Sequence, residues 1–208
     1  MDGKRPPPLN LVVRFIKGIK MTGGRHPHPE ALYYHTAGDT LEAAKAESDP
    51  FKKTELVSTC MVFSALCLEA YINQEFHTFA ETRKIIESND RTPFEVKWLM
   101  LPLLMGSTET FNTGGPPFQV FSELVKTRNH RLVHFKPKDE TDTTDKPVKK
   151  IYFSELVSDV TLAEKYWKCI EGMIIELNRL TSGKTEIPHF LKGSRYTSSV
   201  WADLKFTI

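Results

Sequence analysis

The chain of 208 residues lacks the features that mark several classes of protein. It has three cysteines, Cys60, Cys67 and Cys169. Cys60 and Cys67 would lie roughly 10 Å apart along one predicted helix, which is too far for a disulfide. We interpret the cysteines as small hydrophobic residues and predict a reducing, cytoplasmic setting. No signal peptide is predicted. No unbroken apolar run reaches about 18 residues, so no membrane span is predicted either.

Signatures of cofactor binding are also missing. The sequence has no Gly-rich phosphate loop, no Cys/His spacing typical of zinc and no nucleophile–base pattern. His26, His28 and His35 are interpreted as loop histidines rather than metal ligands. No metal or other cofactor is therefore predicted. The net charge of +2 is too small to indicate a partner, so a surface for nucleic acid would have to be a local patch.

Helical periodicity dominates what is present. An apolar stretch from about Phe51 to Phe79, with Asp49 as N-cap, predicts a buried central helix. Another helix is expected over Ser158 to Ser182, with a capping box at Thr161 and Glu164 and Gly183 at its C-terminal end. Strand patterns are almost absent. The sequence therefore predicts an all-α fold, an antiparallel bundle of four to six helices.

Composition divides the chain into three parts. Residues 1–36 form a basic, Pro/Gly-rich N-terminal arm, residues 37–183 the helical bundle, and residues 184–208 an apolar tail expected to dock on the body or on a second subunit. We expect the arm to contact phosphates and to make binding sensitive to salt. Its basic residues are Lys4, Arg5, Arg14, Lys17, Lys20 and Arg25.

One predicted helix carries an unusual polar group. From Phe118 to Pro137 the apolar residues recur at helical spacing, and neither glycine nor proline interrupts them. Toward its end come five polar residues that a helix built only for packing would not need: Arg128, Asn129, His130, Arg131 and His134.

Four segments in this order resemble the HEPN superfamily. They are LEAYIN at 68–73, KWLMLPLL at 97–104, PFQVF at 117–121 and RNHRLVHFKP at 128–137, and the likeness spans about residues 41–180. The resemblance implies a helical bundle that dimerises with two motif helices facing each other. Active members are metal-independent ribonucleases, so RNA is the implied partner, with an antitoxin or a nucleotidyltransferase as a possible protein partner.

The resemblance also implies roles for individual residues. His134 would transfer protons while the ribose 2′-hydroxyl attacks the adjacent phosphate, and Arg128 would hold that phosphate. Asn129 would orient the phosphate or the histidine. The chain departs from the usual pattern, because five residues rather than four separate Arg128 from His134. Counted back from His134, the arginine position falls on Asn129, and Arg131 is either a substitute or an independent phosphate contact.

Further residues are candidates for supporting the motif. His130, Arg131 and Lys136 are predicted to bind substrate. Glu69 and Asn73 share one face of the central helix and are predicted either to position the motif side chains or to satisfy a neighbouring helix end or an arginine.

Helical geometry limits what one chain could do. At about 100° per residue, Arg128 and His134 point roughly 120° apart, so a compact site would need the two copies of a homodimer. In the alternative interpretation the basic residues form a solvated or ion-paired face, and His134 caps the helix. Two functions follow: an RNA endonuclease acting as toxin or defence effector, or a non-catalytic module that binds RNA, a nucleotide or a protein. A monomer covered by its own tail is the alternative to the dimer.

Overall fold

A computed structural model of the protein describes residues 28–79, 92–133 and 158–192. Every regular element in these ranges is helical, which confirms the all-α prediction. The α-helices are α2 (Pro29–Ala46), α3 (Pro50–Phe79), α5 (Phe94–Leu104), α6 (Phe118–Thr127), α8 (Val160–Leu180) and α9 (His189–Lys192). A π-helix, η1 (Arg128–Val133), continues directly from α6.

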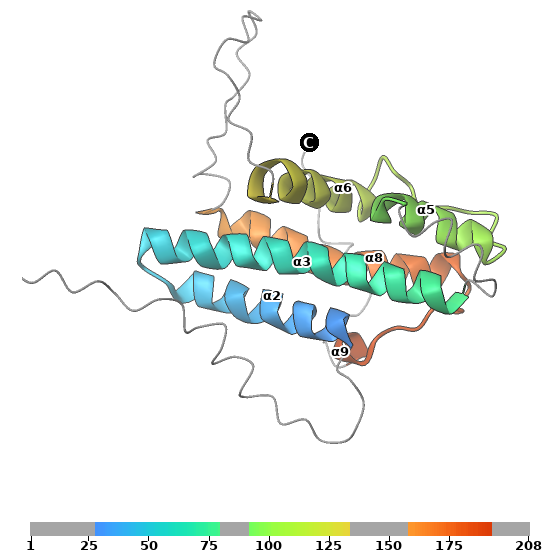
Figure 1. Cartoon of the computed structure of the whole chain (residues 1–208), viewed down its shortest axis with the longest axis horizontal. Helices are drawn as coiled ribbons and strands as arrows, with labels where there is room; N and C mark the ends of the chain where they lie inside the picture. The colour runs from blue at the N-terminus through green and yellow to red at the C-terminus, as the bar shows by residue number, and fades with distance from the viewer. Residues whose placement is uncertain (1–27, 80–91, 134–157, 193–208) are drawn as a thin grey trace, which may run out of the picture.

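The helices pack in layers around α3 and α8. These two lie side by side, with α2 against one side of the pair and α5 and α6 against the other (Figure 1). Between α2 and α3 the chain reverses direction in a short connection, so the two helices contact each other along their length. Helix α6 and its π continuation also contact α3, which brings the motif segment against the longest helix of the fold.

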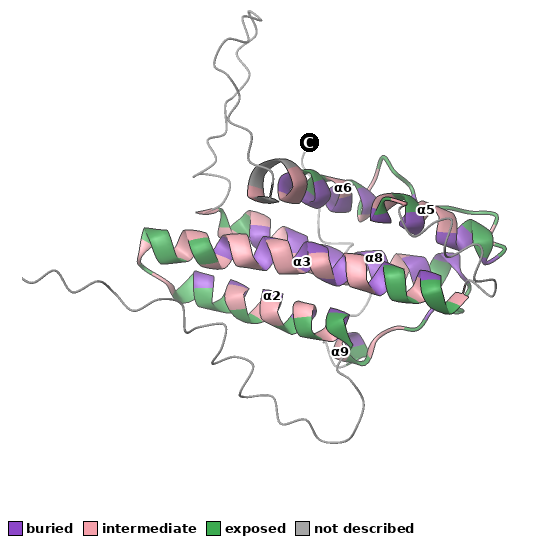
Figure 2. Cartoon of the chain, viewed as in Figure 1, coloured by how far each residue is buried: buried purple, intermediate pink, exposed green. Residues whose placement is uncertain are grey.

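Helix α3 begins and ends where the sequence predicts. The Asp49 carboxylate accepts a hydrogen bond from the Phe51 N–H at 2.9 Å, as an N-cap does. The apolar middle of α3, residues 56–76, was expected to be buried, and the structure shows this in part: Asn73 and Gln74 are exposed. Buried residues of α3 alternate with half-buried and exposed ones, since its neighbours cover only part of its circumference (Figure 2).

The composition of α3 also bears on the question of a membrane. By length and composition alone, α3 is long and apolar enough to cross a membrane. Half of its most apolar 18-residue stretch is buried inside the protein. The core helices of soluble proteins have the same composition, so this finding alone is weak evidence for a span.

Helix α2 starts earlier than predicted. The helical pattern was expected from Ala37, but α2 begins at Pro29, in the first-turn position that proline favours. His35 therefore lies in a helix, so its assignment to a loop is wrong. The Tyr34 ring is buried and stacks on Trp167 of α8 and Phe190 of α9, with centroids 5.3 and 4.7 Å away. Residues 1–27, which hold the basic residues of the arm, lie outside the described residues.

The two ends of α8 are fixed by local hydrogen bonds. At the start, the Asp159 carboxylate accepts from the Leu162 N–H at 3.0 Å, so the N-cap is Asp159 and not the predicted Thr161. At the end, the Gly183 N–H donates to Asn178 O at 2.8 Å and the Ser182 N–H donates to Arg179 O at 3.1 Å. This is a Schellman motif, in which both Ser182 and Gly183 have positive φ.

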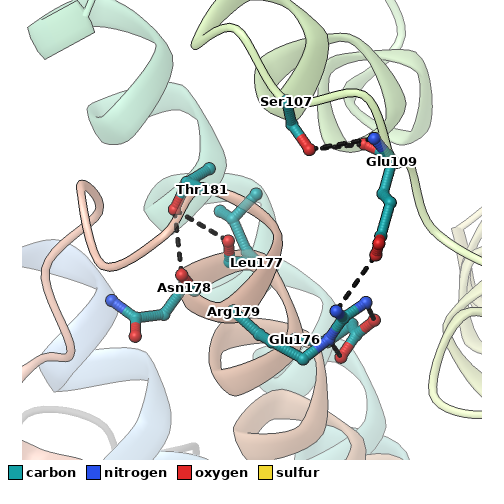
Figure 3. A network of polar contacts seen from close by, with 7 residues as sticks. All are labelled: Ser107, Glu109, Glu176, Leu177, Asn178, Arg179 and Thr181. Carbon is teal, nitrogen blue, oxygen red and sulfur yellow. Dashed lines mark hydrogen bonds and ion pairs between the residues drawn. The ribbon is translucent and has the colours of Figure 1, made fainter.

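Residues 184–192 lie against the helices after this turn. The Lys184 ammonium donates to Met105 O at 2.7 Å, and the Tyr71 hydroxyl donates to Glu186 O at 2.8 Å. Arg179 binds Glu176 and Glu109, and so links the end of α8 to the loop after α5 (Figure 3). Residues 193–208 of the predicted tail lie outside the described residues.

The core contains all three cysteines. Cys60, Cys67 and Cys169 are free thiols and fully buried, which confirms their interpretation as small hydrophobic residues. Burial raises the pKa of the Cys60 thiol to about 12, and burial also raises the pKa of Cys67 and Cys169. The thiols are therefore protonated and unreactive at neutral pH.

Candidate nucleic-acid interface

The end of α6 is held firmly where the motif begins. Leu124 and Val125 are buried, and the hydroxyl groups of Thr127 and Tyr166 lie 3.0 Å apart in the core. The next residue is Arg128. The contact between Thr127 and Tyr166 of α8 therefore fixes the position of the backbone just before Arg128.

From Arg128 onward the helix changes its winding. The prediction of one continuous α-helix toward Pro137 is wrong, because Arg128–Val133 form a π-helix. A π-helix closes i→i+5 hydrogen bonds, occurs mostly as a short interruption of an α-helix, and is frequent at functional sites. The angle of 120° between Arg128 and His134 assumed α-helical winding, so it does not apply to this segment.

Arg128 meets a carboxylate of α3. Its Nη2 lies 3.1 Å from Oε2 of Glu69, with the two side chains 22% and 32% exposed. Within the described part of the chain, that oxygen has no hydrogen-bond partner, so the contact is an attraction of charges rather than a directed hydrogen bond. Nη1 of Arg128 also donates to Oδ1 of Asn129 at 3.5 Å. The structure thus brings together three of the predicted site residues, Glu69, Arg128 and Asn129.

Asn73 has a partner that sequence reasoning missed. The ammonium of Lys97, on α5, donates to Oδ1 of Asn73 at 2.9 Å and lies 5.8 Å from the centre of the Phe76 ring. Lys97 is only 7% exposed. The available signal was a single lysine within the apolar run of KWLMLPLL. We call Glu69 and Asn73, with their partners Arg128 and Lys97, the cationic edge of α3.

Other predicted residues are not placed beside this edge. The backbone of His130 and Arg131 belongs to η1, but their side chains are not described. His134 and Lys136 lie outside the described residues. The proposed proton-transfer group therefore has no position relative to Arg128.

A second polar region involves α3 and the segment after α8. The pKa of Glu75 is raised to about 7, first by burial and then by the neighbouring carboxylates of Glu186 and Glu30, while a hydrogen bond from the Glu186 backbone acts to lower it. Glu30 is buried, and its Oε1 lies 3.2 Å from Nδ1 of His28. We call Glu30, Glu75 and Glu186 the acidic junction.

The described residues contain no group of three or more His, Cys, Asp or Glu side chains that could hold a metal ion. Comparison with protein-family models, curated proteins and solved structures finds no match. Inference about function therefore depends on the geometry of the residues. Of the two polar regions, only the cationic edge presents groups that bind anions.

Proposed function

We propose that the chain is a metal-independent RNA endonuclease with an antiparallel bundle of HEPN type, acting as a homodimer. The observation that supports this is the cationic edge, where a half-buried arginine of the motif segment lies over α3. A guanidinium in this setting offers a planar set of donors that matches a phosphate. The facing motif helices of two copies would supply both halves of the site.

The proposed chemistry uses the protein's own side chains. His134 would accept the proton of the ribose 2′-hydroxyl or donate one to the leaving oxygen. Arg128 would bind the phosphate as charge develops on it. Its present partner is the Glu69 carboxylate, so a phosphate oxygen would take the place of Glu69 against the guanidinium. Asn129, whose amide accepts from Arg128, would orient the same phosphate.

The π-helix supports Arg128 as the motif arginine. A π turn takes up about one residue more than an α turn. The motif in this chain is also one residue longer than the usual form, with five residues between Arg128 and His134. The extra residue of the motif and the extra residue of the π turn agree in number. Arg128 can therefore keep the role that strict counting would transfer to Asn129.

A non-catalytic function is the second candidate. The contact between Arg128 and Glu69 is also what a structural arginine would make. In that case the cationic edge would bind RNA, a nucleotide or a partner protein without cleaving. For either function, an antitoxin or a nucleotidyltransferase is the protein partner we propose to look for.

Cleavage of RNA by the purified protein tests the proposal. We expect single-stranded RNA to be cut in the presence of EDTA, leaving 2′,3′-cyclic phosphate ends. His134→Ala should reduce the rate by about 100- to 10,000-fold, and His130→Ala should reduce it less. Light scattering at micromolar concentration should report a dimer for wild type and both variants. If the protein cuts no RNA but binds it, the non-catalytic function takes the place of the nuclease.

A further inference from the structure

Lys97 is an unusual residue for its place in the fold. It is 7% exposed, and it lies on a helix whose other residues, apart from Glu95, are apolar. Burying an ammonium group costs free energy unless it is compensated. The compensation here includes the Asn73 amide and the face of the Phe76 ring. A neutral side chain would pack here at lower cost, so the charge itself calls for an explanation.

Lys97 and Arg128 reach the same edge of α3. Their partners, Asn73 and Glu69, are four residues apart, so they lie on one face of the helix and about 6 Å apart along it. Two cations from different elements, α5 and η1, therefore meet α3 one helical turn apart. Asn73 faces solvent. The buried ammonium of Lys97 therefore lies directly behind an amide that solvent reaches.

The hydrogen bond also fixes how Asn73 is oriented. Because Oδ1 of Asn73 accepts from Lys97, its Nδ2 carries the two remaining donors of the amide. A phosphate oxygen beside Asn73 would meet these N–H groups and the positive charge of Lys97 together. Of the four side chains of the cationic edge, Lys97 and Arg128 are positively charged and Glu69 is negatively charged.

We propose that Lys97 and Asn73 form a second phosphate contact, one turn of α3 from Arg128, so that an RNA strand follows the cationic edge from η1 toward α5. This inference rests on the proposed RNA-binding function. It adds the path of the strand and a residue pair that the motif does not contain.

Salt-dependent binding of RNA tests this path. The full-length protein with His134→Ala would be titrated with labelled single-stranded RNA at several salt concentrations. Adding Lys97→Met should weaken binding about tenfold, as the loss of one charged hydrogen bond does. It should also lower the slope of log affinity against log salt by about 0.7. Lys97→Arg should restore both.

Lys165→Met is the matched control, because it removes one positive charge from a lysine that pairs with Glu123 at 2.7 Å. Asn73→Asp covers the case in which Lys97→Met does not fold. It keeps an acceptor for Lys97 at an exposed position, but it replaces the N–H donors with negative charge, so it should weaken RNA binding about tenfold as well.

The possible failures are distinguishable. If Arg128→Ala weakens binding while Lys97→Met and Asn73→Asp behave as Lys165→Met does, the second contact is overturned and the proposed function stands. If none of the variants changes binding, both the proposed function and this inference fail. If Lys97→Met lowers only stability and Asn73→Asp has no effect on RNA, Lys97 serves only to join α5 to α3.

Discussion

Helix α3 has two polar regions whose neighbours carry opposite charge. At the cationic edge, Glu69 faces Arg128 and Asn73 faces Lys97. At the acidic junction, Glu75 faces the carboxylates of Glu186 and Glu30. Glu69 and Glu75 are six residues apart, so they point roughly 120° apart around the helix and meet different elements. The same residue type therefore has opposite electrostatic surroundings within two turns of one helix.

The different surroundings of Glu69 and Glu75 give the two carboxylates different roles. Beside an arginine, the carboxylate keeps a guanidinium in place until another anion replaces it. Where it is partly buried and close to other carboxylates, as Glu75 is, its pKa is raised to about 7 and it takes up a proton near neutral pH. The cationic edge is thus suited to bind a ligand, whereas the acidic junction makes the contact of residues 184–192 sensitive to pH.

The largest expected effect comes from Trp98, in the core between α3 and α5. Trp98 follows Lys97 in the sequence and is fully buried. Its ring stacks on the ring of Tyr71, with centroids 5.9 Å apart, and the hydroxyl of Tyr71 donates to Glu186 O. Trp98→Ala should lower the free energy of unfolding by about 3–5 kcal/mol. Urea denaturation would measure it. Trp98→Phe, which keeps a ring, should cost clearly less, and equal losses would argue against this packing role.

A smaller effect is expected from neutralising the carboxylate at the cationic edge. Glu69→Gln removes the ion pair with half-buried Arg128 and should cost about 1 kcal/mol of stability. RNA binding should strengthen, because the anion that competes for Arg128 is gone. Glu123→Gln is the control, since its pair with Lys165 is more exposed. Weaker RNA binding by Glu69→Gln would show that Glu69 positions Arg128 rather than competing for it.

A further expected change is a dependence of stability on pH at the acidic junction. The pKa of Glu75 is raised from 4.5 to about 7 in the folded protein. The folded state therefore binds more protons than the unfolded state between these values, and stability contributed by the protonated carboxyl is lost as the pH rises through about 7. Glu75→Gln should flatten this decline.

Urea denaturation at several values between about pH 5 and pH 8 would measure the decline. The surrounding groups Glu30, Glu186, His28 and Lys192 remain in the variant, so the two proteins differ only at Glu75. Glu55→Gln, at an exposed position of α3, is the control. An unchanged pH profile in Glu75→Gln would assign the dependence to another group.

Periodicity predicted the long helices well. The extent of α3 and the core of α8 follow directly from apolar spacing, and the spacing also placed Glu69 and Asn73 on one face. The start of α2 was missed, because a His-Pro-His-Pro sequence reads as a loop although Pro29 suits a first turn. These errors concern boundaries, which depend on local contacts more than on pattern.

The features that the sequence did not predict depend mainly on contacts between residues far apart in the chain. Lys97 was hidden inside an apolar run, and only packing shows that its ammonium reaches Asn73. The acidic junction joins residues 30, 75 and 186, which no sequence window contains together. The change from α to π winding at Arg128 was not predicted, because the apolar spacing of the segment is the same as that of an α-helix.

The central claim is that Arg128, at the cationic edge, is the phosphate-binding arginine. The most direct test compares the rates at which Arg128→Ala and Arg131→Ala cut the same RNA, with dimer formation checked for both. We predict that Arg128→Ala slows cleavage by about 100- to 1,000-fold and that Arg131→Ala has the smaller effect. Loss of cleavage in Arg131→Ala with near-normal cleavage in Arg128→Ala would contradict the account.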